Sequence, residues 1–328
     1  MTMPNLKNIN LPNINAVLFK DMRQKTKRSK LVVSVFLLNL LFSIIAMIIL
    51  AVLAANAANY NTINYTVFQN FFIVLGFLEF GFIVMITPAI TAGAITTERE
   101  KQTFDVLIST ALTTKQIIRG KYWASILQIM LLIISGFPIY SLVFIYGGVS
   151  FFQALAVLLT LMLLTMYVAA IGIFWSSVSK KTIVATVLTY VILLSLMFGT
   201  MSLTATIKGV SLMINEVITS TTYNDPGLTG DWGVFVLYLN PLCTIYDSIS
   251  GVFGIDIFSS TPGMSGIITG ITDYSANNPL IVLWTPISIA IQILLSWWML
   301  NVSANAIDPL RKKANKGGKK NKRKGQTA

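Results

Sequence analysis

Long apolar stretches separated by shorter polar segments make up most of the chain. Six of these stretches are almost free of charged residues, and they lie at residues 31–55, 67–95, 122–146, 151–176, 182–203 and 280–301. An α-helix needs about 20 apolar residues to cross the hydrocarbon core of a bilayer. The pattern therefore predicts an all-α polytopic membrane protein, with six transmembrane helices in a domain that covers residues 31–307.

Basic residues lie almost entirely on one side of these predicted spans. Of the 24 Lys and Arg residues, all except Lys208 fall before the first span, between spans two and three, between spans four and five, or after the sixth. Cytoplasmic segments of membrane proteins carry an excess of Lys and Arg. The distribution predicts a multi-pass protein with both termini in the cytoplasm and with the long segment between spans five and six outside.

Composition agrees with a membrane protein and excludes several kinds of chemistry. Hydrophobic residues make up 55% of the chain and charged residues 11%, against about 25% charged residues in soluble domains. There is no histidine, and Cys243 is the single cysteine. Histidine-based metal sites, histidine general bases and an intrachain disulfide are therefore excluded. We expect a non-catalytic chain that holds no metal or cofactor of its own.

Both ends of the chain are polar and basic. Within the N-terminal segment 1–30, apolar residues such as Val17, Leu18 and Phe19 mix with bases. This mixture is typical of a helix lying in the plane of the membrane interface, although a basic flank that only anchors the topology would look the same. The tail 308–328 is rich in Lys, Gly and Asn, which predicts disorder and attraction to anionic lipid. Nucleic-acid binding is not expected, because no aromatic residues are interleaved for stacking.

The outer insertion at residues 204–279 is too long for a plain loop in a compact protein. Inside it, the apolar run at residues 232–239 is too short to span a bilayer and ends at Asn240-Pro241. A re-entrant or interfacial helix would stop there, because the residue before a proline is disfavoured in helical geometry. We expect a helical cap over the sixth span; an ordinary surface loop with apolar patches is the alternative.

The polar loop between spans two and three contains an amphipathic pattern. Its apolar residues recur with helical spacing, at Phe104, Leu107, Ile108, Ala111 and Leu112. This spacing predicts a short helix with one apolar face. Thr113 followed by Gln116 fits a capping box, which predicts that a new helix begins there and runs into span three. The apolar face could lie on lipid or insert into a groove of a soluble partner.

Glu79 is the one ionisable residue deep inside a predicted span. It lies twelve residues after Val67, which places it ~18 Å along a helix axis and near the middle of a bilayer. A charged carboxylate there costs about 2.5 kcal/mol or more unless it is paired, hydrated or protonated. Glu79 is therefore a candidate for a transport pathway or a conformational switch. The alternative is a neutral, hydrogen-bonded structural residue.

The loop between spans two and three resembles the cytoplasmic loop of the ABC-2 type permeases, the membrane subunits of a class of ABC transporters. The residues that match the pattern of that loop are Glu98, Arg99, Glu100, Thr103, Phe104, Asp105, Leu107, Ile108, Ser109, Thr110, Leu112, Thr113, Ile117, Gly120 and Lys121. Two positions depart from the pattern: Gln102 stands where glycine is common, and Ala111 stands where proline is common. The six-span layout, the basic N-terminal segment and the outer insertion are also similar to that family.

The resemblance implies that this loop is a coupling helix seated in a cleft of a separate ATP-binding cassette ATPase. The residues it assigns to coupling are Glu98, Arg99, Glu100, Thr103, Phe104, Asp105, Leu107, Ile108, Thr110 and Lys121. Phe104, Leu107 and Ile108 would form the buried face, with the charged residues as polar contacts or as braces for the helix end. ATP and Mg would be bound by the partner, since this chain has no GxxxxGK[ST] phosphate loop.

The resemblance also implies a second permease chain, identical or related, in a bacterial or archaeal plasma membrane. It favours an exporter that works by ATP-driven alternating access. The few charges at the predicted midplane weakly favour a lipidic, amphipathic or peptide-like cargo. Three other classes remain open: a membrane scaffold or signalling subunit whose ATPase does mechanical work without translocation, a secondary transporter or channel, and an intramembrane enzyme. The last two are disfavoured by the single intramembrane acid, the lack of a convincing internal repeat and the absence of histidine.

Overall fold

The computed structural model describes residues 29–60, 65–109, 113–145, 149–219, 230–253 and 283–307. Within these residues every regular element is helical. The helices in chain order are α2 (Ser29–Tyr60), α3 (Tyr65–Thr91), α4 (Gly93–Glu100), α5 (Phe104–Ile108), α6 (Thr114–Ile145), α7 (Phe151–Val178), α8 (Thr182–Leu194), the π-helix η2 (Ser195–Gly199), α9 (Thr200–Thr219), the 3-10 helix η3 (Gly230–Leu239), α10 (Pro241–Phe253) and α13 (Trp284–Ile307). The expected in-plane N-terminal helix, residues 220–229 and 254–279 of the outer insertion, and the C-terminal tail lie outside the described residues.

Five stretches of the described helices are long and apolar enough to cross a membrane. They are Phe71–Glu100, Thr114–Tyr140, Phe151–Val178, Thr182–Ile207 and Trp284–Ile307. They confirm the predicted spans two to six as apolar helices. The first predicted span falls within α2, whose apolar segment Asn39–Val52 is shorter than the other five. A sixth crossing by α2 therefore stays a prediction.

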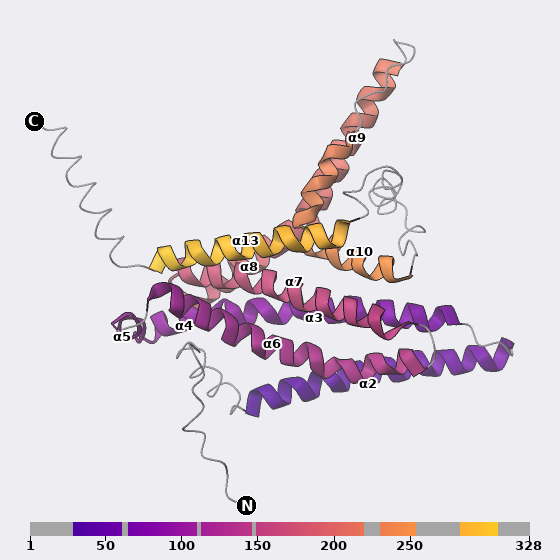
Figure 1. Ribbon diagram of the computed structural model, residues 1–328, viewed down its shortest axis with the longest axis horizontal. Coiled ribbons are helices and arrows are strands. Elements are labelled where there is room, and N and C mark those ends of the chain that lie inside the picture. The colour runs from indigo at the N-terminus through magenta and orange to yellow at the C-terminus, as the bar shows by residue number, and fades with distance from the viewer. Residues whose placement is uncertain are drawn as a thin grey trace, which may run out of the picture.

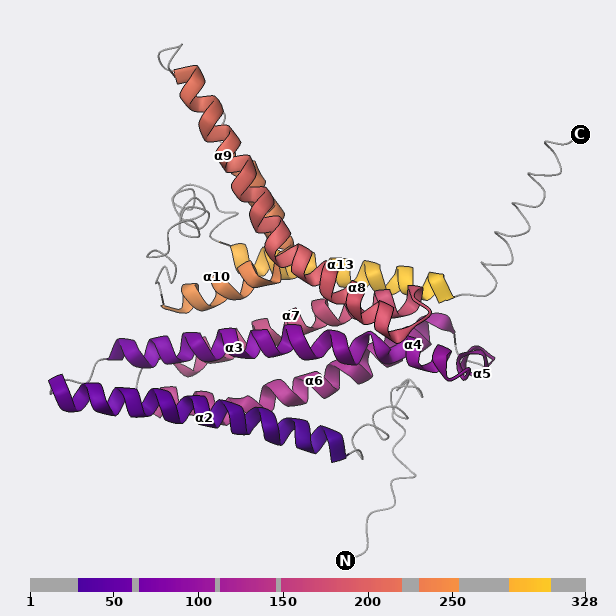
Figure 2. The ribbon, with the colours of Figure 1, turned by 180° about the vertical axis from the view of Figure 1, so that it is seen from behind.

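Helix α7 lies at the centre of the bundle. Figures 1 and 2 show it running beside α3, α6 and α13, and side chains along most of its length are buried. It begins at a capping box: the Ser150 hydroxyl accepts from the Gln153 backbone N–H at 3.3 Å, and the Gln153 amide oxygen accepts from the Ser150 N–H at 2.9 Å. A helix that is apolar around its whole circumference is typical of a membrane span or of a buried core helix, and α7 has both features.

The second predicted span is irregular near one end. Pro88 lies inside α3, and the single residue Ala92 separates α3 from α4, although its N–H still donates to the Pro88 carbonyl at 2.9 Å. The backbone N–H groups of Ile95 and Thr96 donate to the hydroxyl of Ser176 on α7, at 3.0 and 3.3 Å. In a membrane interior these groups would have no water partner. The Ser176 hydroxyl thus gives the N–H groups of Ile95 and Thr96 an acceptor within the protein.

Residues 230–253 of the outer insertion form a hairpin of two helices, η3 and α10, that meet at Asn240. Asn240 is buried and caps α10, because its side-chain oxygen accepts from the Leu242 N–H at 2.8 Å. Its side-chain N–H donates to the Met197 carbonyl of the π-helix at 2.8 Å. Gln292 of α13 donates to the Tyr238 carbonyl at 3.1 Å. The expectation that the run ends at Asn240-Pro241 and packs on the last span is confirmed for residues 230–253, and the surface-loop alternative is wrong there.

Helix α9 leaves the bundle at a steep angle, as both ribbon views show (Figures 1 and 2). It continues directly from α8 through η2, so that residues 182–219 form one helical run. The apolar stretch long enough to span a membrane ends at Ile207, close to the predicted end at residue 203, whereas the helix itself continues to Thr219.

A substitution at Gly172 would test how closely α7 packs against α3. A Cβ added at this position would lie 1.9 Å from the Thr91 hydroxyl oxygen and 2.8 Å from the Thr91 Cβ. We expect Gly172→Ala to lower the free energy of unfolding by about 1–3 kcal/mol, the usual cost of overpacking a core. Gly81→Ala is the matched control, because nothing lies within 4 Å of its added methyl group. Thermal unfolding in detergent measures both, and equal stabilities of the two variants would contradict the prediction.

Candidate functional site

The loop between the second and third apolar spans folds as two short helical pieces and a cap. Helix α4 ends in a Schellman motif: the Thr103 N–H donates to the Glu98 carbonyl at 3.0 Å, and the Gln102 N–H donates to the Arg99 carbonyl at 3.1 Å. Gln102 has a positive φ of 58°, the left-handed conformation in which glycine is favoured. Glycine is common at this position in the family pattern, and the backbone conformation of Gln102 is the one that favours glycine.

The predicted capping box at the start of the third span is confirmed. The Thr113 N–H donates to the Gln116 side-chain oxygen at 3.0 Å, and the Gln116 N–H donates to the Thr113 hydroxyl at 3.3 Å. Helix α6 begins at the next residue. The amphipathic helix before it is shorter than predicted, since α5 ends at Ile108. Thr110, Ala111 and Leu112 lie outside the described residues.

Glu98, Arg99 and Glu100 each bind a different helix of the bundle. The carboxylate of Glu98 forms an ion pair with Lys121 of α6, with 2.6 Å between the Lys121 Nζ and the Glu98 Oε1. Lys121 is only 4% exposed, and a buried ammonium group is tolerated when a carboxylate pairs with it. The end of α4 is thereby fixed to the start of α6.

Arg99 binds the C-terminal end of α7. Its two terminal nitrogens donate to the carbonyl oxygens of Ser179 at 2.5 Å and Ser177 at 2.6 Å. The last carbonyls of a helix have no intrahelical partner, and a cation there also complements the helix dipole. The guanidinium lies over the Phe104 ring, 4.9 Å from the ring centre. Arg99 therefore joins α4, α5 and α7 at one point.

Glu100 binds the N-terminal end of α8. Its carboxylate accepts from the Thr182 backbone N–H at 2.6 Å and from the Thr182 hydroxyl at 2.9 Å. The first N–H groups of a helix are free donors, and a negative charge there is favoured by the helix dipole. The preceding Lys181 makes no side-chain cap, so Glu100 supplies the cap from another part of the chain. We call the contacts of residues 98–100 with α6, α7 and α8 the three-helix bracket.

The apolar side chains of α5 divide between the bundle and the surface. Phe104 and Ile108 are half-buried and pack against a core cluster that includes Ile118 and Tyr122. Val106, in contrast, is 68% exposed. Part of the face that we expected to enter a partner's cleft therefore contacts the chain's own helices. The helical spacing of apolar residues did not identify Val106 as a surface contact, because Val106 lies off the apolar face that contains Phe104 and Ile108.

A cleft adjoins the three-helix bracket. It lies between the α4–α5 turn, the α7–α8 turn and the end of α13, with Phe104 and Ala306 among its lining residues. Asp105 and Lys180 line it as exposed side chains of opposite charge. Sequence reasoning had placed Asp105 among the polar contacts but had assigned no role to Lys180.

Glu79 lies far from this bracket, in the bundle between α3 and α6. It is 2% exposed, and its Oε2 accepts a hydrogen bond from the Tyr140 hydroxyl at 2.5 Å. Its second oxygen, Oε1, is buried without a hydrogen-bond partner. Sequence reasoning had found the glutamate but not the tyrosine, which comes from the other side of the α3–α6 contact. In the described part of the chain no cluster of His, Cys, Asp or Glu could hold a metal ion.

A family model described as ABC-2 family transporter protein matches residues 15–300. The match covers residues 15–30 of the N-terminal segment, all the helices from α2 to α10, the outer insertion, and α13 as far as residue 300. No curated protein matches the sequence. The family match therefore rests on most of the chain, including the loop whose motif first pointed to it.

The left-handed backbone at Gln102 gives a prediction for stability. A non-glycine residue in this conformation costs roughly 1–2 kcal/mol, so Gln102→Gly should raise the free energy of unfolding by about 1 kcal/mol. Gln102→Ala is the matched control, because it removes the same side chain and keeps the Cβ. Thermal unfolding of the purified variants in detergent measures the difference. A glycine variant no more stable than the alanine variant would show that the turn carries no strain.

Proposed function

The chain belongs to the ABC-2 family of transporter membrane proteins, and we propose that it is the permease subunit of an ABC exporter. In this proposal a separate ATP-binding cassette subunit binds ATP and Mg and docks at the α4–α5 end of the bundle, on the cytoplasmic side. A second permease chain, identical or related, completes the pathway. The cargo is lipidic or amphipathic, and it moves by alternating access in a plasma membrane.

The three-helix bracket is the observation that carries this proposal. Residues 98–100 hold α6, α7 and α8 by charged contacts at 2.5–2.9 Å. A force applied to α4 and α5 by a closing ATPase therefore reaches three spans at once. Hydrogen bonds to charged groups contribute about 1.5–3 kcal/mol each, so the helices move with the bracket more easily than they separate from it.

The exposed surface beside the bracket supports docking of a soluble partner. Val106 offers an exposed apolar side chain, and Asp105 and Lys180 offer one charge of each sign at the adjacent cleft. Partly apolar interfaces with polar rims are usual for protein contacts. Phe104 and Ile108 lie on the opposite side of α5, where they pack against the core of the bundle and hold α5 in place. No observation favours a scaffold or signalling subunit over a transporter, and the experiments below separate the two.

Docking is tested at Val106. We expect Val106→Asp to reduce the amount of ATPase subunit that copurifies with the chain by about tenfold, since a charge would replace a buried apolar contact. The fold should be unaffected, because the side chain is exposed. The control is Lys115→Asp, which also introduces an acid at an exposed position, in the first turn of α6. Undiminished copurification of Val106→Asp would contradict docking on α5.

The passage of conformational change from the ATPase to the spans is tested at Arg99, in an experiment that needs no cargo. Nitroxide labels at Val187 on α8 and Leu294 on α13, both exposed, report the distance between these helices by electron paramagnetic resonance. ATP should change this distance in the complex with the ATPase. We expect Arg99→Gln to retain ATPase binding and basal hydrolysis but to lose most of the ATP-dependent change, because its two contacts with α7 are gone. Arg99→Lys is the conservative variant, which keeps the charge but not the fork.

An unchanged distance response in Arg99→Gln would contradict the bracket as the transmission route. ATP-dependent movement of labelled amphiphile across inverted membrane vesicles then separates an exporter from a scaffold. A complex that hydrolyses ATP and changes conformation, yet moves no labelled compound from any class tried, would favour the scaffold.

A further inference from the structure

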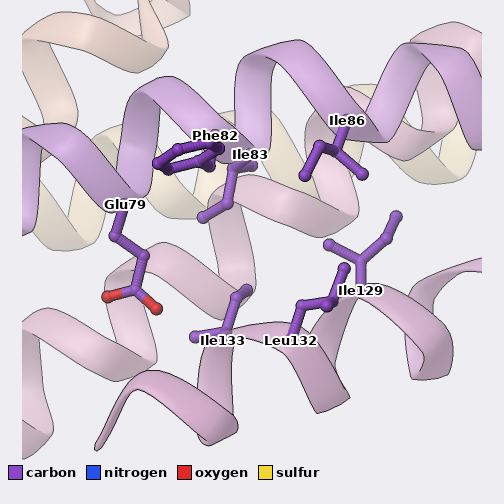
Figure 3. A pocket seen from close by; sticks show the side chains of 7 residues that line it. All are labelled: Glu79, Phe82, Ile83, Ile86, Ile129, Leu132 and Ile133. Carbon is purple, nitrogen blue, oxygen red and sulfur yellow. The ribbon is translucent and has the colours of Figure 1, made fainter. Parts of the chain in front are cut away.

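A small apolar cavity lies between α3 and α6 directly beside Glu79. Figure 3 shows four side chains of α3 directed toward three of α6. The lining residues are Glu79, Phe82, Ile83, Ile86, Ile129, Leu132 and Ile133. Phe82 and Ile86 are also partly exposed on the surface of α3, so the lining of the cavity reaches the outside of the bundle.

Only one oxygen of Glu79 is used within the protein. The Tyr140 hydroxyl donates to Oε2 at 2.5 Å, whereas Oε1 is buried without a partner. A buried acceptor without a donor costs about 1–3 kcal/mol. Gly136 of α6 faces Oε1, since a Cβ there would lie 3.5 Å from Oε1 and 3.3 Å from the Phe42 ring. The carboxyl group thus combines an acceptor without a partner and an adjoining cavity.

The lining restricts what can bind. Apart from Glu79, every lining residue is a hydrocarbon side chain. A buried water molecule needs two to four polar partners, and a metal ion needs several oxygen ligands; the lining supplies neither. The free volume is about 10 Å³, which is close to the least that admits one water-sized group. A ligand that fits has one small donor at its end and hydrocarbon behind it.

We propose that this cavity is the head-group site for an aliphatic amphiphile whose small head, a hydroxyl or a primary ammonium group, donates a hydrogen bond to Glu79 Oε1. The chain of the ligand lies along Phe82, Ile83 and Ile86 toward the outside of α3. An apolar pocket with one polar group that fixes orientation is the usual form of a small-molecule site. The inference rests on the proposed function only in making this ligand a cargo, because binding itself requires no ATP.

Binding is measured on the purified full-length chain in detergent, by scintillation proximity with tritiated dodecanol and tritiated dodecylamine. Two competitors without a donor, dodecyl methyl ether and dodecyltrimethylammonium, test the head group. We expect both tritiated probes, or one of them, to bind saturably and the donor-free compounds to compete at least about tenfold more weakly, the factor that one buried hydrogen bond provides. Saturable binding of dodecanol alone indicates a neutral alcohol ligand. Saturable binding of dodecylamine alone indicates a cationic ligand.

Three variants test the site itself. Glu79→Leu removes the acceptor and should weaken binding of either probe at least about tenfold, whereas Glu79→Gln keeps a carbonyl and should weaken the amine more than the alcohol. Ile86→Trp fills the space without touching the carboxyl group and should abolish binding even if Glu79→Leu folds poorly. Met85→Trp is the matched control on the same helix, since Met85 is exposed and does not line the cavity.

Equal binding to the native chain and to both Glu79→Leu and Ile86→Trp would overturn the proposal, as would donor-free compounds that compete as well as dodecanol and dodecylamine. Absence of saturable binding by either probe would also overturn it. None of these results bears on docking at Val106 or on transmission through Arg99. Failure of the site and failure of the proposed function are therefore distinguishable.

Discussion

The guanidinium of Arg99 at the end of α7 is the contact around which the α4–α5 segment is arranged. It occupies the carbonyl oxygens of Ser177 and Ser179 and covers the Phe104 ring. The flanking acids then extend in two other directions, Glu98 to α6 and Glu100 to α8. Three consecutive residues on a helix point to different sides of it, since each is rotated by about 100° from the last. One turn of helix can therefore hold three neighbours only if it lies between them, as α4 does.

Buried side chains also hydrogen-bond to the backbone where helices of the bundle are irregular. Ser176 accepts from the backbone just after the α3–α4 junction, and Asn240 donates to the Met197 carbonyl in the π-helix. Water is absent from the hydrocarbon region, so buried polar groups there need partners within the protein. Glu79 Oε1 is a buried acceptor without a hydrogen-bond partner, and a cavity adjoins the same carboxyl group. These two observations together support a ligand there.

Local signals in the sequence were enough for much of the fold. The apolar stretches predicted spans two to six, the Thr113–Gln116 spacing predicted where α6 begins, and Asn240-Pro241 predicted the break in the insertion. Each of these depends on residues close together in the chain. The bracket could not be predicted in the same way, because Arg99 and its acceptor Ser179 are 80 positions apart. The family resemblance singled out residues 98–100, but it did not show which helix each of them holds. The length of α5 and the exposure of Val106 also depend on tertiary packing, since Phe104 and Ile108 turn toward the core.

The continuous run of α8, η2 and α9 connects the two irregular parts of the structure. At one end Glu100 binds Thr182, and fifteen residues later the Met197 carbonyl binds Asn240 at the vertex of the η3–α10 hairpin. Asn240 also accepts from Leu242, and Gln292 ties the hairpin to α13. If the bracket displaces the start of α8, either the hairpin follows or several buried hydrogen bonds break, at about 1–3 kcal/mol for each group left unpaired. Because no water can replace those bonds in the hydrocarbon region, joint movement costs less. In the mechanism proposed above, a displacement at the α4–α5 end would therefore be carried along α8 to the hairpin without any contact between the two.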